Sequence, residues 1–456
     1  MNSDIRKTMN KRYKLLRACD GTPLSADTWS NYKRARNKIT TLLRNAEGLY
    51  WKERFAECND SKSFWKTVAE ATGKHRSCKI GILKGAHNED LVDNYEKAET
   101  LNSFFINVGK ELAEKLPSAD NLNQHIYQVV PTTHHLSINK PKLKADLKKI
   151  KTNKASGPDD ISARSLAIAG HSAAVGLSTV FESCFAKNHF PSEWKVAKVN
   201  AVFKKGSKSD VSNYRPISLL SIPSKLLESQ VCHIIDEHLA ECGIRNHKQW
   251  GFCKGLSTES MLISMTESWK LALDKGLSVG AVFIDFQKAF DTVSHEILSR
   301  KLQAIGISGS IHEWIMCYLT NRSQFTVVNG CKSSSGCVRF GVPQGSLLGP
   351  RLYTIFVNDL PDCLDGTGEI YLYADDTTLS YIGRSVEEIF TALNKMVNDV
   401  LLWRRRNQLT IYPVKTEAML IRKSPFVGPL PLITSILIWI INSHGQIIFL
   451  MLKRIL

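Results

Sequence analysis

The chain has 456 residues, of which 43% are hydrophobic, and its formal net charge is +17. This length exceeds that of a typical domain with a single hydrophobic core, so we predict two or three subdomains. The composition excludes wholesale disorder. The charge indicates a polyanionic partner, with nucleic acid as the first candidate and a merely solubilising surface as the alternative.

Residues 1–115 are predicted to form a basic, helical segment. In "WSNYKRARNKITTLLRNAEGLYWKERFAE" the apolar residues recur at helical spacing, with Lys and Arg on the other faces. The predicted apolar stripe consists of Tyr32, Ala35, Ile39, Leu42 and Leu43. Residues 116–140 are polar and contain proline, which indicates a connector, and helical and strand patterns become denser from Pro141.

Adjacent aspartates occur twice. Asp159 and Asp160 lie in "GPDDIS", whose Gly-Pro pair is typical of a loop. Asp375 and Asp376 lie in "YLYADDTTLSY", between two runs that predict strands, so we expect them at the tip of a hairpin. A divalent cation there would turn the repulsion between the carboxylates into attraction, and an ordinary polar turn is the alternative.

Basic residues gather in "WKVAKVNAVFKKGSKSDVSNYRPISLLSIPSK", which predicts a strand followed by a basic turn. Pro216 favours an extended conformation for Arg215. Together, Lys204, Lys205 and Arg215 could hold a triphosphate through charge-assisted hydrogen bonds, and a solvated loop is the alternative.

The eleven cysteines form no Cys-x-x-Cys pair, which predicts free thiols in a reducing compartment. One cluster of helical spacing contains potential zinc ligands, but it lacks a paired-cysteine knuckle and indicates ordinary helix residues instead. It consists of Cys232, His233, His238, Cys242 and His247.

Two helices have clear boundaries. One begins at Ser294 in "SHEILSRKLQAIG" and ends at Gly306. The other spans Ser385–Arg406 and begins with a capping box of Ser385 and Glu388. The C-terminal run "PLPLITSILIWII" is too short to span a bilayer, so we predict no membrane association.

Asp285 ends the apolar run Ala281–Ile284 in "GAVFIDFQKAFDTVSHE", which predicts a buried strand. A charge at that point needs a metal ion or a partner such as a nearby lysine. With Asp375 and Asp376, it suits two-metal phosphoryl transfer by a pair of Mg²⁺ ions. In "RFGVPQGSLLGPRLYTIFVNDL", Gly341 and Gly345 permit close backbone approach to a ligand, and Gln344 offers a donor and an acceptor; a plain turn before a helix is the alternative.

Seven ordered motifs resemble the reverse transcriptase of non-LTR (LINE-type) retrotransposons over roughly residues 141–423. They are "KASGPDDIS", "YRPISLL", "QWGFCKGLSTES", "FIDFQKAFDTV", "GVPQGSLLGPRLYTIFVNDL", "YADDTTL" and "NQLTIYPVKTE". The resemblance implies an α+β right-hand polymerase, with fingers at about 141–278 and a palm core at about 279–423. It also implies an RNA template, a DNA primer, dNTPs and two Mg²⁺ ions, for which Mn²⁺ can substitute.

The same resemblance implies roles for individual residues. Asp285, Asp375 and Asp376 resemble the catalytic, metal-binding carboxylates, and Phe286 would add a backbone carbonyl. Lys415 resembles a general acid near the departing pyrophosphate. The residues that resemble contacts to dNTP are Lys204, Lys205, Arg215, Phe290 as the gate against the ribose 2′-hydroxyl, Gln344 and Gly345, and those to template or primer are Pro343 and Tyr373.

Other regions depart from the family. Nothing resembles the endonuclease that usually precedes this polymerase, so a nuclease would come from elsewhere. Residues 424–456 do not resemble the helical thumb, which suggests an aberrant tail and a truncated element copy. The alternatives are therefore an active polymerase, in the nucleus and cytoplasm expected of a retroelement enzyme, and an inactive nucleic-acid-binding remnant. An RNA-dependent RNA polymerase is disfavoured by Phe290 and by the motif order.

Overall fold

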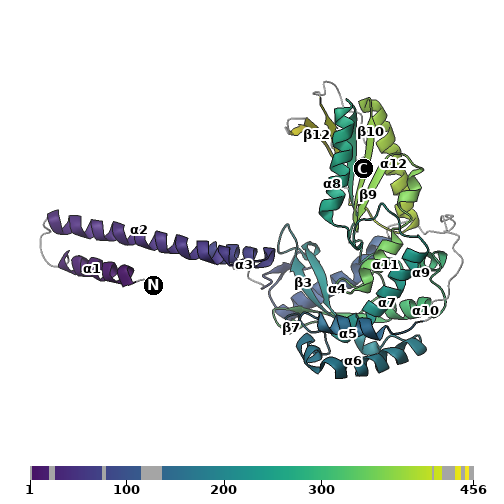
Figure 1. Cartoon of the computed structure of the whole chain (residues 1–456), viewed down its shortest axis with the longest axis horizontal. Coiled ribbons are helices and arrows are strands. Elements are labelled where there is room, and N and C mark those ends of the chain that lie inside the picture. The colour runs from purple at the N-terminus through teal and green to yellow at the C-terminus, as the bar shows by residue number, and fades with distance from the viewer. Residues whose placement is uncertain are drawn as a thin grey trace. The chain divides into compact units, whose positions relative to one another are not determined.

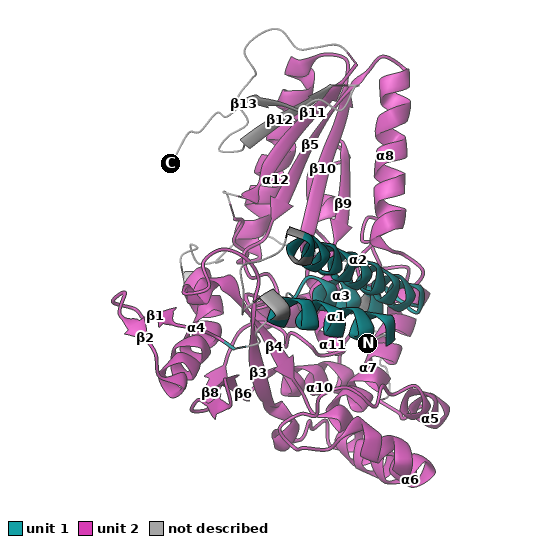
Figure 2. Cartoon of the chain, turned by 90° about the vertical axis from the view of Figure 1, so that its left-hand side faces the viewer, with its two compact units in different colours: residues 1–79 teal, residues 80–456 magenta. Residues whose placement is uncertain are grey.

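The computed structural model describes residues 3–19, 26–73, 79–114, 136–412, 415–423, 437–442 and 447–450. The chain divides into two compact units, Met1–Lys79 and Ile80–Leu456, which Figure 2 distinguishes by colour. Helices and strands are mixed along the second unit, in agreement with the predicted α+β class.

The first unit is helical in its described residues. Its helices are α1 (Ser3–Cys19), α2 (Ala26–Ala56) and α3 (Ser61–Ala71). Ala35 and Ile39 of the predicted stripe are buried, whereas Leu43 is exposed. An ion pair of 3.0 Å between Arg54 and Glu70 joins α2 to α3. Only part of the predicted apolar stripe is therefore buried within this unit.

A large sheet organises one half of the second unit. In the described residues its strand order is β13-β12-β11-β5-β10-β9, and β11 and β12 are parallel while the other neighbours are antiparallel. The strands are β5 (Ser278–Asp285), β9 (Glu369–Tyr373), β10 (Asp376–Gly383), β11 (Glu417–Arg422), β12 (Leu437–Asn442) and β13 (Ile447–Leu450).

Two helices cover this sheet, one on each side (Figure 1). Trp269 of α8 (Thr258–Asp274) packs among Val279 and Ala281 of β5. The apolar stripe of α12 (Val386–Arg406) is buried in the main core, as its helical spacing predicted. Ser385 caps α12 by accepting a 3.1 Å hydrogen bond from the backbone N–H of Glu388.

A second sheet has the order β4-β3-β6-β7, with β8 paired to β6, among the described residues. Its strands are β3 (Val196–Phe203), β4 (Tyr214–Leu219), β6 (Arg322–Val328), β7 (Cys331–Lys332) and β8 (Gly336–Val338). The helix α4 (Asn94–Glu114) packs Leu101 and Phe105 against it, next to the small hairpin of β1 (Leu83–Lys84) and β2 (Asp90–Leu91). Residues 80–114 thus belong to this core, although the sequence grouped them with residues 1–79.

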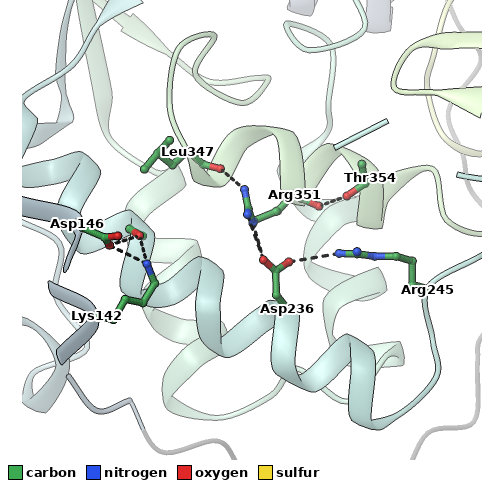
Figure 3. Close-up of polar contacts among 8 residues, drawn as sticks. Lys142, Asp146, Asp236, Arg245, Leu347, Arg351 and Thr354 are labelled. Carbon is green, nitrogen blue, oxygen red and sulfur yellow. Dashed lines mark hydrogen bonds and ion pairs between the residues drawn. The ribbon is translucent and has the colours of Figure 1, made fainter. Parts of the chain in front are cut away.

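Further helices connect and support the sheets. They are α5 (Lys140–Lys148), α6 (Ala163–Ala186), α7 (Ile222–Glu241), α9 (His295–Ala304), α10 (Ser310–Leu319) and α11 (Leu348–Phe356). Ser294 caps α9, where the sequence predicted its start. Figure 3 shows how Asp236 of α7 accepts hydrogen bonds from Arg245, at 3.3 Å, and from Arg351 of α11, at 3.1 Å. These contacts fix α11 against α7.

Of the residues considered for zinc, Cys232, His233 and His238 lie in α7, as predicted, whereas Cys242 follows the end of this helix and His247 lies in a turn. His238 is buried in α7, and its Nε2 makes a 2.6 Å hydrogen bond with the carbonyl of Ile305. Within the described ranges, no helix combines the length and hydropathy needed to cross a membrane. Of residues 424–456 only β12 and β13 are described, so the prediction of an aberrant tail lies largely outside the described residues.

Candidate active site

The second aspartate pair lies on a hairpin formed by β9 and β10, as the sequence predicted. Tyr373 and Asp376 are the last cross-strand partners, so Ala374 and Asp375 form the tip. Ala374 has φ +59°, a left-handed conformation that costs a non-glycine residue about 1–2 kcal/mol. The side chain of Gln249 accepts a hydrogen bond of 3.2 Å from the Ala374 N–H and so holds this tip in place.

Strand register brings the third aspartate to the same point. In the antiparallel pairing of β10 with β5, Asp376 lies directly opposite Asp285. Residues in direct opposition share one face of a sheet, with their side chains as near neighbours. The three predicted carboxylates therefore meet at one end of the sheet, half-buried at Asp285 and Asp375 and exposed at Asp376.

The backbone of Phe286 is oriented towards this end. Phe286 forms an antiparallel bridge with Ile411. The backbone hydrogen bonds of this bridge are made by the residues before and after these two. Tyr412 N–H donates to the Asp285 carbonyl at 2.8 Å, and Gln287 N–H donates to the Thr410 carbonyl at 2.7 Å. Because backbone groups alternate sides along a strand, the Phe286 carbonyl points the other way, towards β10.

The electrostatic environment joins the carboxylates to the basic turn between β3 and β4. Burial raises the pKa of Asp375, and the charge of Asp285 raises it further. Partial burial also raises the pKa of Asp376, although this residue is exposed, and the charges of Asp375 and Asp285 raise it further. The charges of Lys204 and Arg215 lower both pKa values, so these cations belong to the surroundings of the carboxylates. The structure thus gathers residues predicted to bind a triphosphate next to those predicted to bind metal.

The basic residues are held by the second sheet. Arg215 is extended within β4, as Pro216 predicted, and lies opposite Val202 of β3. Lys204 follows β3 directly, and its N–H donates to the Asn213 carbonyl at 2.9 Å. Burial lowers the pKa of Lys204, and the charges of Arg215 and Lys415 lower it further. Lys204 and Lys205 are both exposed at the surface, so the burial that acts on Lys204 is partial.

Lys415 contacts one of the carboxylates directly. Its Nζ donates to Asp285 Oδ2 at 2.9 Å, which is the lysine partner considered as an alternative to a metal ion. Among the described residues, no group of three or more His, Cys, Asp or Glu side chains is arranged to hold a metal ion. The donor chemistry nevertheless fits Mg²⁺, since three carboxylates and a carbonyl are hard oxygen ligands whose mutual repulsion a cation would relieve.

Phe290, the predicted sugar gate, stacks on Tyr353 of α11, with ring centroids 4.6 Å apart and ring planes 15° apart. Tyr353 is fully buried. Burial raises the pKa of the Tyr353 phenol, and the charges of Asp375 and Asp376 raise it further. The ring that supports Phe290 therefore also lies near the carboxylates.

The "GVPQG" loop packs against the chain itself. A Cβ added at Gly341 would lie 2.6 Å from the Phe290 carbonyl oxygen, and one added at Gly345 would lie 2.5 Å from the Ser218 carbonyl oxygen. The predicted close approach at both glycines is thus to neighbouring backbone. Gln344 is half-buried and donates from Nε2 to Asp291 Oδ1 at 2.8 Å. Pro343 and Tyr373 are also half-buried.

Four residues of the site were not predicted: Gln249, Lys288, Asp291 and Tyr353. Lys288 donates from Nζ to the carbonyls of Ser212, at 3.3 Å, and Tyr214, at 3.2 Å, which directly precedes Arg215 in β4. Lys288 and Asp291 follow Asp285 in "FIDFQKAFD", so the charges of that motif were a usable signal. Gln249 and Tyr353 carry no such signal, because their roles depend on tertiary contacts.

Comparison with known proteins identifies the family. The family described as "Reverse transcriptase (RNA-dependent DNA polymerase)" matches residues 203–445, more than half of the chain. The chain belongs to this family. Residues 1–60 also match the family described as "Female sterile protein K10 C-terminal domain".

Curated relatives agree with this assignment. The chain is 28% identical over 412 residues to "Probable RNA-directed DNA polymerase from transposon BS" of Drosophila melanogaster, which covers 86% of this chain and 45% of the relative. It is 30% identical over 262 residues to "RNA-directed DNA polymerase from mobile element jockey" of Drosophila funebris, covering 56% of this chain and 28% of the relative. For "Probable RNA-directed DNA polymerase from transposon X-element" of Drosophila melanogaster, the identity is 29%, over 58% of this chain and 30% of the relative.

The predicted resemblance to non-LTR retrotransposon reverse transcriptases is therefore confirmed. The chain spans less than half the length of each of these curated relatives.

Proposed function

We propose that the chain is an RNA-directed DNA polymerase, which adds deoxynucleotides to the 3′-hydroxyl of a DNA primer on an RNA template. The observation that carries this proposal is the register of β5 and β10, which sets Asp285 opposite Asp376. Asp375 adjoins them at the hairpin tip, and the charges of Lys204 and Arg215 lower the pKa values of Asp375 and Asp376. In such an arrangement the basic side chains can bind the phosphates of a nucleotide, and the carboxylates can bind the metal ions that its transfer requires.

The proposed architecture is that of a right-hand polymerase. The palm core, at about residues 279–423, would include α12 with the strands β9, β10, β11 and most of β5. The fingers correspond to about residues 141–278, including β3, β4 and their basic turn. The basic helical segment predicted for residues 1–115 would be confined to residues 1–79, because residues 80–114 pack against the second sheet, and residues 116–140 would be a connector. The net charge of +17 supports a nucleic-acid partner for the whole chain.

Asp285, Asp375, Asp376 and the Phe286 carbonyl would hold two Mg²⁺ ions, or Mn²⁺ in their place. When bound, these ions would activate the primer hydroxyl and stabilise the departing pyrophosphate. The carboxylates themselves must be ionised to do this, and Lys204 and Arg215 favour that form by lowering their pKa values.

Other residues would bind and orient the nucleotide. Lys204, Lys205 and Arg215 would contact the triphosphate, with Lys288 holding the strand that carries Arg215. Phe290, rigid on Tyr353, would exclude a ribose 2′-hydroxyl. Lys415 would donate a proton to the departing pyrophosphate from its Nζ. Gln344 and Gly345 would contact the nucleotide, and Pro343 and Tyr373 the template or primer.

A second candidate function is nucleic-acid binding without turnover. The ion pair of Lys415 with Asp285 supports it, because a lysine on a carboxylate oxygen neutralises a charge that metal binding requires. In this case the basic surface would retain salt-sensitive RNA binding while nucleotide transfer fails.

Primer extension on an RNA template, with dNTPs and Mg²⁺, distinguishes the two candidates. The full chain is compared with a double variant, Asp375→Ala with Asp376→Ala. Extension by the full chain and none by the variant is the result expected of a polymerase. Salt-sensitive RNA binding by both proteins, with extension by neither, would instead establish the non-catalytic alternative.

A further inference from the structure

The segment Phe290–His295 holds the "GVPQG" loop through several hydrogen bonds. Val342 N–H donates to the Phe290 carbonyl and Gly341 N–H donates to the Val293 carbonyl, both at 2.8 Å. His295 Nε2 makes a further 2.8 Å hydrogen bond with the Gly341 carbonyl. The loop and the proposed sugar gate are therefore fixed to each other through the backbone.

Within this segment, the side chain of Asp291 is hydrogen-bonded to the side chain of Gln344 in the loop. Asp291, the residue after the gate, accepts at Oδ1 a 2.8 Å hydrogen bond from Nε2 of Gln344. Its other oxygen, Oδ2, is shielded from solvent and has no hydrogen-bond partner among the described residues. Gln344 is held at its backbone as well, since its carbonyl accepts the Ser218 N–H at 2.8 Å.

The chemistry of this contact fixes the direction of an amide. An ionised carboxylate can only accept hydrogen bonds, whereas the glutamine amide has a donor end and an acceptor end. Asp291 must therefore take the NH₂ end, which leaves the carbonyl oxygen Oε1 of Gln344 on the other side. Burial raises the pKa of Asp291 to about 6, so its carboxylate is still ionised at neutral pH.

We propose that Asp291 is a positioning residue, which orients the Gln344 amide so that its carbonyl oxygen is offered, as an acceptor, to the nucleotide or template. The group recognised would be a hydrogen-bond donor, such as a sugar hydroxyl or an exocyclic amine. This inference rests on the proposed function for the role of Gln344, but the contact that carries it is independent of the metal site.

A double-mutant cycle tests this proposal. The full chain, Asp291→Leu, Gln344→Ala and the double variant are compared in primer extension, with KM for one dNTP and kcat measured separately. We expect Asp291→Leu to raise KM on the order of tenfold, the value of about one hydrogen bond, with kcat little changed. In the Gln344→Ala background the same substitution should raise KM no further, because no amide remains to be oriented.

Two further variants guard against a trivial loss of folding. Asp291→Asn keeps the shape of the side chain but lets the facing amides pair in either direction, so a rise in KM of about two- to fivefold is expected. Asp160→Asn, on an exposed loop residue, is the matched control and should leave KM unchanged. An equal rise in KM for Asp291→Leu in both backgrounds, or a loss of kcat alone, would overturn the proposal.

Equilibrium binding of the same dNTP to each variant on a primer–template, in Ca²⁺ to prevent turnover, separates this inference from the proposed function. If the full chain binds dNTP but never extends the primer in Mg²⁺, the proposed polymerase function fails. The cycle in dissociation constants then still decides the role of Asp291. An additive cycle refutes that role even in an active enzyme.

Discussion

Asp159–Asp160 and Asp375–Asp376 are the same dipeptide in two regions of the molecule. Asp159 accepts the Ser221 hydroxyl at 2.5 Å and the Ile161 N–H at 3.3 Å, so its carboxylate holds a loop against the start of α7. Asp160 is exposed. By contrast, Asp376 lies opposite Asp285, the last residue of β5, and Asp375 adjoins it at the hairpin tip.

The difference teaches that the dipeptide carries little information by itself. The hydrogen-bond donors near Asp159 satisfy its charge locally and leave no reason for a metal ion. In the second pair, by contrast, the charges of Asp375 and Asp285 raise the pKa of Asp376, and burial raises it as well. What separates the pairs is strand register, which joins residues that are distant in the sequence.

Substituting the second pair should have the largest effect on primer extension, and substituting the first pair is the control. Asp375→Ala with Asp376→Ala removes proposed metal ligands whose charge stabilisation is worth several kcal/mol, so extension should fall at least about 10³-fold. Asp159→Ala with Asp160→Ala, the matched control, should retain extension within a few-fold. Rates of single-nucleotide addition measure both, and similar losses in both variants would remove the distinction between the pairs.

Opening the gate next to the second pair should have the next largest effect. Phe290→Ala removes the ring that would meet a 2′-hydroxyl, so the ratio of ribonucleotide to deoxynucleotide use should rise by about 10–200-fold. The ratio of kcat/KM values for the two sugars is the measurement. Tyr353→Phe keeps the stacked ring and should retain discrimination. Unchanged sugar selection in Phe290→Ala would locate the gate elsewhere.

Asp291, which belongs to neither pair, extends the comparison to the pH dependence of stability. The pKa of Asp291 is raised to about 6 in the folded chain, above the usual value of about 3.9. The folded state then binds more protons than the unfolded state between these values, so Asp291 favours folding below pH 4. That contribution is lost as the pH rises through 6, by at most about 3 kcal/mol.

Asp291→Asn should remove this pH dependence. Urea unfolding of the full chain and of the variant, at intervals from pH 4.5 to 7.5, measures it as the difference in free energy of unfolding. The variant should gain stability relative to the full chain as the pH rises. A difference that is constant over this range would show that Asp291 titrates as an ordinary carboxylate.

The smallest effect is expected where the first pair meets α7. Ser221→Ala removes the hydroxyl that donates to Asp159, which should lower the free energy of unfolding by about 1 kcal/mol. Primer extension should be unchanged, because this contact is structural. A loss of extension with normal stability would mean that the first pair takes part in activity.

Much of the fold followed from local patterns. Ser294 and Ser385 marked helix starts because their hydroxyls satisfy free N–H groups, and Pro216 kept Arg215 extended. The exposure of Leu43 could not be predicted, since helical spacing indicates an apolar face but not what covers it. Likewise, α4 joins the second sheet through contacts distant in the sequence.

The site was predictable where one motif contained its signal. The carboxylates and the basic turn came from their own segments, and the structure brings them together. The contact of Lys415 with Asp285 was only one of two alternatives in the sequence, because either a cation or a lysine satisfies a carboxylate. The direction of the Gln344 amide depends on Asp291, which lies 53 residues earlier in the sequence.

The segment that supports the hairpin tip also protects the sheet. Trp250 N–H donates to the Leu372 carbonyl at 2.8 Å, and Leu372 N–H donates to the Lys248 carbonyl at 2.9 Å, so residues 248–250 pair with the outer side of β9. An open strand edge with free backbone groups is a template for aggregation. Because β9 ends the described sheet, this pairing and the ion pair of Lys248 with Glu369 close an edge on which another chain could otherwise add a strand.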